Sequence, residues 1–342
     1  MPNSIKIGIL GAGTWGVALA RMLCQEGKSV TLWSALETEI DELKNTRKHP
    51  HLPGIELPRD LVYTKEIEEA CVGMDIVVFA VPSPFVRETA RKAAPYISDG
   101  QIIADVAKGI EENTLLTMTE IIFEEIKNPS VKLVALSGPT HAEEVIKNLP
   151  TTIVSASKDA DAAAFVQAAF TSRCLRVYTN DDVLGVELCG ALKNVIALGS
   201  GIATGLGCGD NAKAALITRG IAEISRLGMA MGCREQTFGG LAGIGDLIVT
   251  ATSMHSRNNR CGMLIGQGMS SSEATKQIGM VVEGLNALPA AIRLSEKYNV
   301  EMPIVETVHA VVSGKVDVSQ AIGALMSREL KSEIGATAFR GK

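Results

Sequence analysis

The sequence predicts an α/β fold, in which a doubly wound, mostly parallel sheet is followed by an all-α C-terminal domain. Two observations carry this prediction. The first half of the chain alternates short β-branched runs with helical patterns, and this strand pattern stops near residue 180. Continuous apolar strands that are separated by helices are typical of a parallel sheet covered on both faces.

The individual elements follow from these patterns. The N-terminal half holds apolar runs that read as strands, with a helix after the first of them, and the C-terminal half holds helical patterns only. Asn180-Asp181-Asp182 forms a polar break and a helix cap, so we place the domains at 1–180 and 181–342. The predicted strands are 5–10, 30–33, 75–81, 101–106 and 133–136, and the predicted helices are 16–27, 184–203, 211–231, 272–277, 281–298 and 303–313.

The composition excludes several classes of protein. Its 342 residues suffice for two domains, and a content of 46% hydrophobic and 21% charged residues is that of a globular chain. A net charge of -5 provides no basic face for nucleic acid. No uninterrupted apolar stretch reaches the roughly 18 residues of a membrane span. The seven scattered cysteines form no C-x-x-C pair, which argues against disulfides and metal sites and favours the cytoplasm.

A glycine-rich loop follows the first strand. Gly11, Gly13 and Gly16 fit the pattern G-x-G-x-x-G, with Thr14 and Trp15 between the last two glycines. In such a loop the first glycine makes a tight turn, the second lets the backbone approach a pyrophosphate, and the third lets helix and strand pack closely. The helix N-terminus then favours the anion. The N-terminal domain is therefore predicted to be Rossmann-like and to bind NAD or NADP.

The end of the second strand should distinguish the two cofactors, because an acid there binds ribose hydroxyls and an arginine accepts a 2′-phosphate. Ser34 stands at this end as the expected cofactor contact, and neither Ala35 nor Leu36 is charged. Glu37 comes slightly late and Arg47 is remote. The choice between NAD and NADP stays open, with a lean towards NAD.

Lys193 is the most informative charged residue. It is the only charged side chain between residues 188 and 203, and small residues flank it. We therefore expect it to be buried, which lowers the pKa of a lysine and suits general acid–base catalysis. A lysine that reaches to solvent or forms an ordinary ion pair is the alternative.

Further candidates lie at predicted strand ends and loops. Lys108 follows one strand and His141 follows the next, where ligands bind in open α/β folds, although both could belong to plain turns. His141 could act as a base, after Lys193 in order of preference. Asp246 ends a glycine-rich segment and could orient a lysine. Arg257, between Ser256 and Asn258, could grip a phosphate, unless this is an ordinary surface loop.

Six segments of the chain together resemble the bacterial NAD(P)-dependent glycerol-3-phosphate dehydrogenase family. They occur in the family's order and extend over nearly the whole chain. The segments are GAGTWGVALA (11–20), KGIE (108–111), LSGPTHA (136–142), NDDVLGVELCGALKN (180–194), GLAGIGDL (240–247) and SRN (256–258). The chain departs from the family at the adenosine end, where Ala35-Leu36 replaces a basic residue or histidine and His51 replaces a tyrosine.

The resemblance implies an enzyme that interconverts dihydroxyacetone phosphate and sn-glycerol 3-phosphate for glycerophospholipid synthesis. Lys193 is the implied proton donor and acceptor, with Lys108 and Asp246 as further catalytic residues. The implied substrate contacts are Lys108, Gly138, Thr140, Lys193, Asp246, Ser256, Arg257 and Asn258. Beside the glycine loop and Ser34, the implied cofactor contacts are Thr14, Trp15, Lys108, Ala142, Arg257, Val281 and Glu283.

The expected mechanism has Lys193 protonate the carbonyl oxygen of the substrate while Asp246 aligns it and Arg257 anchors the phosphate. Two alternatives remain. One is a two-domain dehydrogenase of another hydroxy acid or sugar phosphate, and the other is an NAD(H)-sensing protein without turnover. The partner is a small molecule in each case, and a homodimer is one alternative for the assembly.

Overall fold

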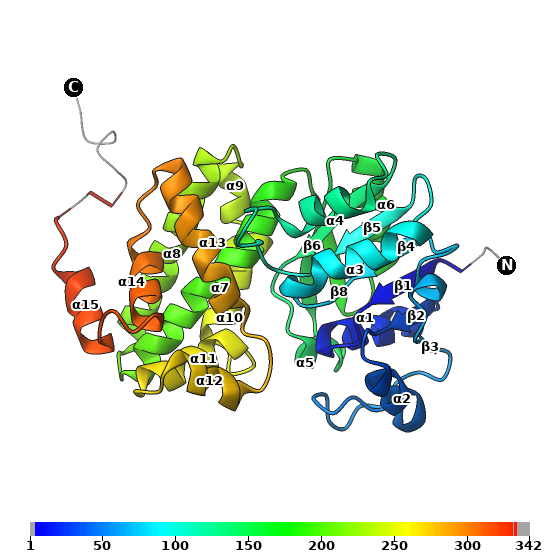
Figure 1. Ribbon diagram of the computed structural model, residues 1–342, viewed down its shortest axis with the longest axis horizontal. Helices are drawn as coiled ribbons and strands as arrows, with labels where there is room; N and C mark the ends of the chain where they lie inside the picture. The colour runs from blue at the N-terminus through cyan, green and yellow to red at the C-terminus, as the bar shows by residue number, and fades with distance from the viewer. Residues whose placement is uncertain (1–3, 331, 334–342) are drawn as a thin grey trace.

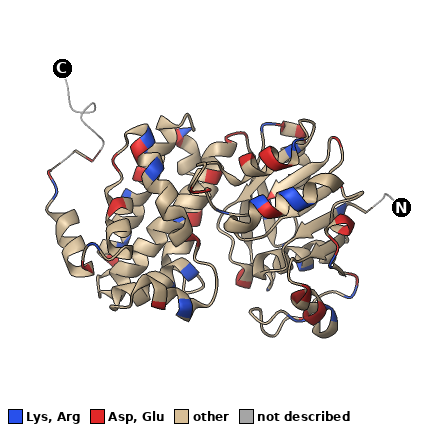
Figure 2. Ribbon diagram, viewed as in Figure 1, with Lys and Arg blue, Asp and Glu red and all other residues tan. Residues whose placement is uncertain are grey.

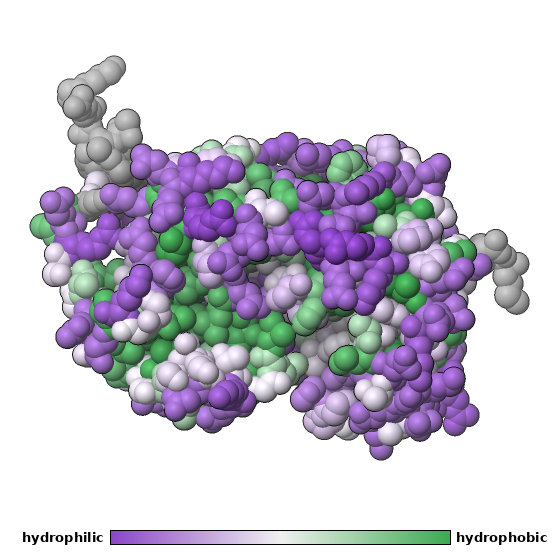
Figure 3. All heavy atoms as spheres, in the orientation of Figure 1, coloured by the Kyte–Doolittle hydropathy of each residue, from purple (hydrophilic) through white to green (hydrophobic). Residues whose placement is uncertain are grey.

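The computed structural model describes residues 4–330 and 332–333, in two parts that lie side by side (Figure 1). One part is built around a sheet and the other consists of helices. In the space-filling view the surface is hollowed between them (Figure 3). The carboxyl ends of the parallel strands face the helical part, so the ligand-binding edge of the sheet lies at this junction.

The sheet has eight strands in the order β3-β2-β1-β4-β5-β6-β7-β8. All neighbouring pairs are parallel except β6 and β7, so the prediction of a mostly parallel sheet is confirmed. The first six positions have the 3-2-1-4-5-6 order of dinucleotide-binding sheets. The strands are β1 Lys6–Leu10, β2 Ser29–Trp33, β3 Val62–Thr64, β4 Ile76–Phe79, β5 Ile102–Asp105, β6 Lys132–Ser137, β7 Thr151–Ala156 and β8 Leu175–Asn180.

Helices cover both faces of the sheet, as a doubly wound fold requires. In β4, Ile76 and Val78 pack on the side of α1 and α6, whereas Val77 and Phe79 pack on the side of α3 and α4. This alternation explains why the strand reads as a continuous apolar run. The helices here are α1 Thr14–Gln25, α2 Glu37–Thr46, α3 Val86–Ala93, α4 Met118–Ile126, α5 Ala142–Val145 and α6 Ala160–Phe170, with 3-10 turns η1 Ile67–Ala70, η2 Ser83–Phe85 and η3 Ala94–Tyr96.

After β8 the described chain is helical, and the predicted helices are confirmed to within two residues at each end. The predicted division at residues 180 and 181 falls between β8 and α7 and stays a proposal; residues 334–342 of the second part lie outside the described chain. The elements are α7 Val183–Gly205, α8 Asp210–Ala230, α9 Glu235–Phe238, the π-turn η4 Leu241–Gly245, α10 Asp246–Thr252, α11 Arg257–Gly266, α12 Ser271–Ile278, α13 Glu283–Tyr298, α14 Pro303–Val312 and α15 Val318–Met326.

Helix α7 is the core of the helical part. Its N-terminus is capped by Asp182, whose Oδ1 atom accepts the N–H of Gly185 at 3.0 Å, as the polar break predicts. Among the described residues, α7 alone has the length and mean hydropathy for a membrane crossing, and 89% of its most apolar window is buried inside the protein. Apolar surface is visible beside it in the lower half of the helical part (Figure 3).

Small residues bring α11 unusually close to α7. A Cβ atom on Gly201 would lie 2.1 Å from the carbonyl oxygen of Asn259, and one on Gly262 would lie 2.1 Å from that of Leu198. The two backbones therefore touch, which leaves no room for larger side chains. This packing fixes the position of Arg257, at the start of α11, relative to α7.

Candidate active site

The glycine loop closes tightly between β1 and α1. Gly11 has a φ of 126°, which side chains rarely adopt, and its N–H donates to the carbonyl of Trp33 at 2.8 Å. A Cβ atom on Gly16 would lie 2.0 Å from the carbonyl oxygen of Gly11. The first and third glycines thus serve the turn and the helix–strand packing.

The second glycine differs, because no protein atoms lie close to the position that its side chain would occupy. Gly13 is the N-cap residue of α1, no side chain caps this helix end, and an added Cβ atom would meet nothing within 4 Å. The free N–H groups of Thr14 and Trp15 and the helix dipole favour an anion at this position. These residues fit the pyrophosphate of a dinucleotide.

Asp246 joins two lysines from the two parts of the molecule. Its Oδ1 atom lies 2.7 Å from Nζ of Lys193 on α7, and its Oδ2 atom lies 2.7 Å from Nζ of Lys108. Lys108 follows β5 at the carboxyl edge of the sheet, so the shared carboxylate bridges the sheet and the helices. Asp246 itself begins α10, directly after the π-turn that the glycine-rich segment forms.

Burial changes the pKa values of Lys193 and Asp246. Lys193 is 5% exposed and Asp246 is 1% exposed. Burial lowers the pKa of Lys193 to about 7, because the loss of hydration outweighs the attraction of Asp246, and the charge of Lys108 adds to the lowering. Burial acts in the opposite direction on Asp246, but the two lysines overcome it and lower its pKa. The prediction that Lys193 is buried is therefore confirmed.

The hydrogen bonds distinguish the two lysines. The three donors of Lys108 are engaged by Gly138 O at 3.0 Å, by Thr140 Oγ1 at 3.3 Å and by Asp246. Lys193 donates to Asp246 and to Thr250 Oγ1 at 2.6 Å. An ammonium group has three protons, so Lys193 retains one for a ligand, whereas Lys108 retains none.

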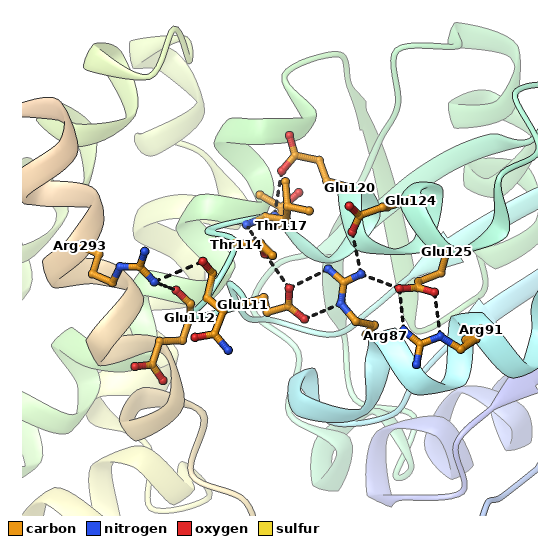
Figure 4. Close-up of polar contacts among 12 residues, drawn as sticks. Arg87, Arg91, Glu111, Glu112, Thr114, Thr117, Glu120, Glu124, Glu125 and Arg293 are labelled. Atoms are coloured by element: carbon orange, nitrogen blue, oxygen red, sulfur yellow. Dashed lines mark hydrogen bonds and ion pairs between the residues drawn. The ribbon is translucent and has the colours of Figure 1, made fainter.

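The loop that carries Lys108 is held by charged side chains (Figure 4). Arg87 on α3 forms two bonds of 2.7 Å with the carboxylate of Glu111 and one of 2.6 Å with Glu125 on α4. From the helical part, Arg293 on α13 donates to the carbonyl oxygen of Glu112. This support is not evident in the sequence, because its members are far apart in the chain and each has the pattern of an ordinary surface charge.

A second group of polar residues surrounds the start of α11. Ser256 caps the helix by accepting the N–H of Asn259 at 3.2 Å. The amide of Asn258 donates to Asn194 Oδ1 at 2.9 Å and accepts the N–H of Gly284 at 2.8 Å. Ser256 and Asn258 are both buried, and these bonds tie α11 to α7 and α13. Asn194 directly follows Lys193, so the two polar groups of the site adjoin through α7.

Arg257 lies at the start of α11 with a half-buried side chain. Burial lowers the pKa of its guanidinium, against the opposing effect of the carboxylates of Glu283 and Glu143. Within the described part of the chain, no hydrogen bond or ion pair engages this guanidinium. It is therefore available for an anionic ligand beside a helix N-terminus.

Glu283 closes the junction from the other side. Its carboxylate accepts the N–H of Ser83 at 3.1 Å and the hydroxyl of Ser83 at 2.5 Å. Ser83 follows β4 and Glu283 begins α13, so this contact joins the two parts across the ligand-binding edge. Val281 lies just before α13, and Ala142 is the first residue of α5. No polar contact within the described chain connects these two residues to the lysine pair.

His141 is held apart from the lysine pair. Its Nε2 atom lies 3.4 Å from the carbonyl oxygen of Val249, and its ring meets that of His255 edge-on at 5.9 Å. Burial lowers its pKa, and the charge of Lys193 lowers it further. The described structure shows no hydrogen bond from His141 to either lysine, which leaves Lys193 as the better placed acid–base group.

Comparison with known proteins identifies relatives over nearly the whole chain. Residues 6–163 match the family profile described as the NAD-dependent glycerol-3-phosphate dehydrogenase N-terminus, and residues 182–323 match the corresponding C-terminus. A Lactobacillus delbrueckii subsp. bulgaricus protein named NAD(P)+ glycerol-3-phosphate dehydrogenase 2 is 62% identical, over 96% of this chain and 99% of the relative. An Agathobacter rectalis protein with the name NAD(P)+ glycerol-3-phosphate dehydrogenase is 52% identical, over 96% and 97%.

The fold is also that of a solved structure. The crystal structure of glycerol-3-phosphate dehydrogenase from Coxiella burnetii superposes with a TM-score of 0.91 and 36% identity, and it covers 95% of this chain and 99% of its own. The similarity therefore includes both the sheet and the helical part, together with the junction between them.

Proposed function

The chain belongs to the NAD-dependent glycerol-3-phosphate dehydrogenase family, and from this premise we propose how its residues carry out the reaction. The reaction is the interconversion of dihydroxyacetone phosphate and sn-glycerol 3-phosphate with NAD(P)(H). A single observation carries the proposal: a buried lysine with one free proton and a pKa of about 7 shares the carboxylate of Asp246 with Lys108, which lies at the carboxyl edge of a dinucleotide-binding sheet.

Lys193 supplies and removes the proton. When bound, NAD(P)H would supply the hydride for C2 of dihydroxyacetone phosphate. As negative charge develops on the C2 oxygen, Lys193 donates its free proton to that oxygen. In the reverse direction, neutral Lys193 accepts the proton of the C2 hydroxyl. A pKa of about 7 suits both roles near neutral pH.

Asp246 and Lys108 keep the acid in place. The carboxylate of Asp246 accepts a hydrogen bond from Lys193 at 2.7 Å and thereby fixes the direction of the remaining N–H bond. After Lys193 has given up its proton, Asp246 stays paired with Lys108, so no unpaired charge remains buried. Lys108 adds positive charge near the reacting oxygen, and it contacts the substrate by exchanging one of its bonds to Gly138 or Thr140.

Arg257 anchors the phosphate of the substrate. Its guanidinium is free of hydrogen bonds within the described chain, and the capped start of α11 adds the positive end of a helix dipole. A planar guanidinium binds two phosphate oxygens at once, which a lysine does not do. Ser256 and Asn258 hold this helix end in place and complete the phosphate site.

The two alternatives have less support. A guanidinium also binds a carboxylate or the phosphate of another sugar, so Arg257 alone does not exclude a dehydrogenase of another hydroxy acid or sugar phosphate. The relatives named glycerol-3-phosphate dehydrogenase argue against that alternative. A sensor without turnover has no need for a buried lysine that is held by a carboxylate. We also propose a cytoplasmic location, which fits the seven free cysteines, whereas a homodimeric assembly stays a prediction from the sequence.

The test is the identity of the product. Purified protein is incubated with NADH and either dihydroxyacetone phosphate or unphosphorylated dihydroxyacetone, and the products are separated by chiral chromatography. We expect sn-glycerol 3-phosphate, without its enantiomer, from the phosphorylated substrate alone. Equal use of both substrates would remove the phosphate site from the proposal, and no product from folded, cofactor-binding protein would refute the reaction.

A further inference from the structure

The end of β2 lies directly beside the glycine loop. Gly11 N donates to the carbonyl of Trp33, the last residue of β2, at 2.8 Å, and Ser34 follows at once. Ser34 therefore stands where an acid contacts the adenosine ribose in many dinucleotide-binding sheets. It is only 6% exposed, so the surrounding protein fixes its position.

The hydroxyl of Ser34 brings a carboxylate to this position. Its Oγ atom accepts the N–H of Leu36 at 3.1 Å and donates its single proton to Oε2 of Glu39 at 2.5 Å. Glu39 belongs to the first turn of α2, five residues along the chain from Ser34. The acid that is missing at the strand end is thus supplied by the helix that follows it.

The charges around this carboxylate bear on the choice of cofactor. Helix α2 and its surroundings are mainly acidic (Figure 2). In the part of the chain that the structure describes, no lysine or arginine forms an ion pair with Glu39. Two basic side chains of this region are paired elsewhere: Lys65 with Glu37 and Asp41, and Arg47 with Glu56.

We propose that Glu39, held by Ser34, binds the adenosine ribose hydroxyls and makes this enzyme selective for NAD(H) over NADP(H). The inference rests on the proposed function, because it concerns the cofactor of that reaction. A carboxylate accepts several hydrogen bonds, and Ser34 uses only one of its acceptor positions. The remaining positions suit the 2′- and 3′-hydroxyl protons of NAD(H).

NADP(H) meets the opposite situation at the same place. Its 2′-phosphate replaces a hydrogen-bond donor by a group with negative charge, which Glu39 repels. Among the described residues, no lysine or arginine is paired with Glu39 to weaken this repulsion. Discrimination therefore comes both from a bond that only NAD(H) makes and from a repulsion that only NADP(H) meets.

Cofactor binding without substrate provides the test. Dissociation constants of NADH and NADPH are measured by fluorescence titration for the wild type, Glu39→Gln and Glu42→Gln. Glu42 lies on the exposed side of the same helix and controls for the change of net charge. We expect the wild type to prefer NADH, and Glu39→Gln to reduce that preference by roughly ten- to a hundredfold, the effect of losing charge-assisted hydrogen bonds. Glu42→Gln should keep the preference.

A further variant tests the contribution of Ser34. Ser34→Ala keeps the carboxylate but frees it, so it should lose part of the preference for NADH while the protein stays folded. Equal affinity of the wild type for both cofactors, or an unchanged preference in Glu39→Gln, would overturn the inference. The titrations contain no substrate, so they test Glu39 separately from the reaction. Selective NADH binding by a protein that shows no turnover in a separate assay would contradict the proposed function but support the role of Glu39.

Discussion

The carboxylate of Asp246 lies 2.7 Å from the ammonium group of Lys193, and both side chains are almost fully buried. A buried pair of this kind gains little stability, because the loss of hydration offsets the attraction of the charges. The pair instead serves to orient the proton of Lys193 that is transferred in the reaction. The same carboxylate binds Lys108, so the site holds one more positive than negative charge, which suits a developing oxyanion.

The first prediction concerns pH. The pKa of Lys193 is lowered to about 7, so its protonated form is lost as the pH rises through 7. We expect kcat/KM for the reduction of dihydroxyacetone phosphate to fall above about pH 7, and kcat/KM for the reverse oxidation to rise over the same range. Profiles from pH 5.5 to 10 measure both. If kcat/KM changes near pH 10 instead, the acid–base group is a lysine of ordinary pKa, which would contradict the account.

The second prediction concerns the phosphate. Arg257→Ala removes the free guanidinium, so KM for dihydroxyacetone phosphate should rise by roughly ten- to a hundredfold, the value of a charged hydrogen-bonded pair. Arg219→Ala, on the exposed side of α8, is the matched control and should leave KM unchanged. Since Arg257 is also an expected cofactor contact, the affinity for NADH is measured in parallel. An unchanged KM in Arg257→Ala would reject it as the anchor.

The third prediction separates the glycines of the loop. Gly13→Ala introduces a Cβ atom that meets no protein atom within 4 Å, at a φ of -64° that alanine adopts freely. The protein should therefore keep its melting temperature but bind NADH more weakly, because the methyl group occupies the space for the pyrophosphate. Gly16→Ala places a Cβ atom 2.0 Å from Gly11 O and should destabilise the fold itself. Normal NADH affinity in folded Gly13→Ala would show that the cofactor does not bind there.

The fourth prediction concerns a buried acid between the two parts. Glu187 on α7 accepts hydrogen bonds from Thr119 N at 2.8 Å and from the hydroxyl groups of Thr117 and Thr119, at the start of α4. Burial raises its pKa to about 7 from an ordinary 4.5, although these bonds oppose the shift. Between these two values the folded state binds a proton that the unfolded state lacks, so the free energy of unfolding falls as the pH rises.

Glu187→Gln removes this titration. Relative to the wild type, its free energy of unfolding should increase by about 2 to 3 kcal/mol between pH 5 and pH 8, from the size of the pKa shift. Urea denaturation at both pH values measures the difference, with Glu42→Gln as an exposed control. If the difference in the free energy of unfolding between Glu187→Gln and the wild type is independent of pH, the pKa of Glu187 is not raised by burial.

The sequence predicted the elements whose patterns are long or strongly apolar. The helix around Lys193 and the strands that precede the glycine loop and Lys108 are all present. Strands β3, β7 and β8 were not predicted. β3 has three residues, and in β8 exposed side chains such as Arg176 and Tyr178 alternate with buried ones, so neither gives a continuous apolar run.

Parts of the site depend on contacts between distant residues, which one sequence does not reveal. The burial of Lys193 followed from its apolar neighbours, and its pairing with Asp246 followed from charge. The bond from Ser34 to Glu39 and the support of Glu111 by Arg87 depend on how a helix folds back over a strand end or a loop. In the sequence, nothing distinguishes Glu39 from the neighbouring acids Glu37, Asp41 and Glu42.

The central claim is that Lys193 is the acid of this reaction, and turnover of Lys193→Met tests it most directly. Oxidation of NADH that depends on dihydroxyacetone phosphate is followed at saturating substrate for the wild type, Lys193→Met and the control Lys213→Met on α8. We predict that kcat of Lys193→Met falls by roughly two to four orders of magnitude, the range for a general acid, while it still binds NADH. Near-normal turnover in Lys193→Met would contradict the account.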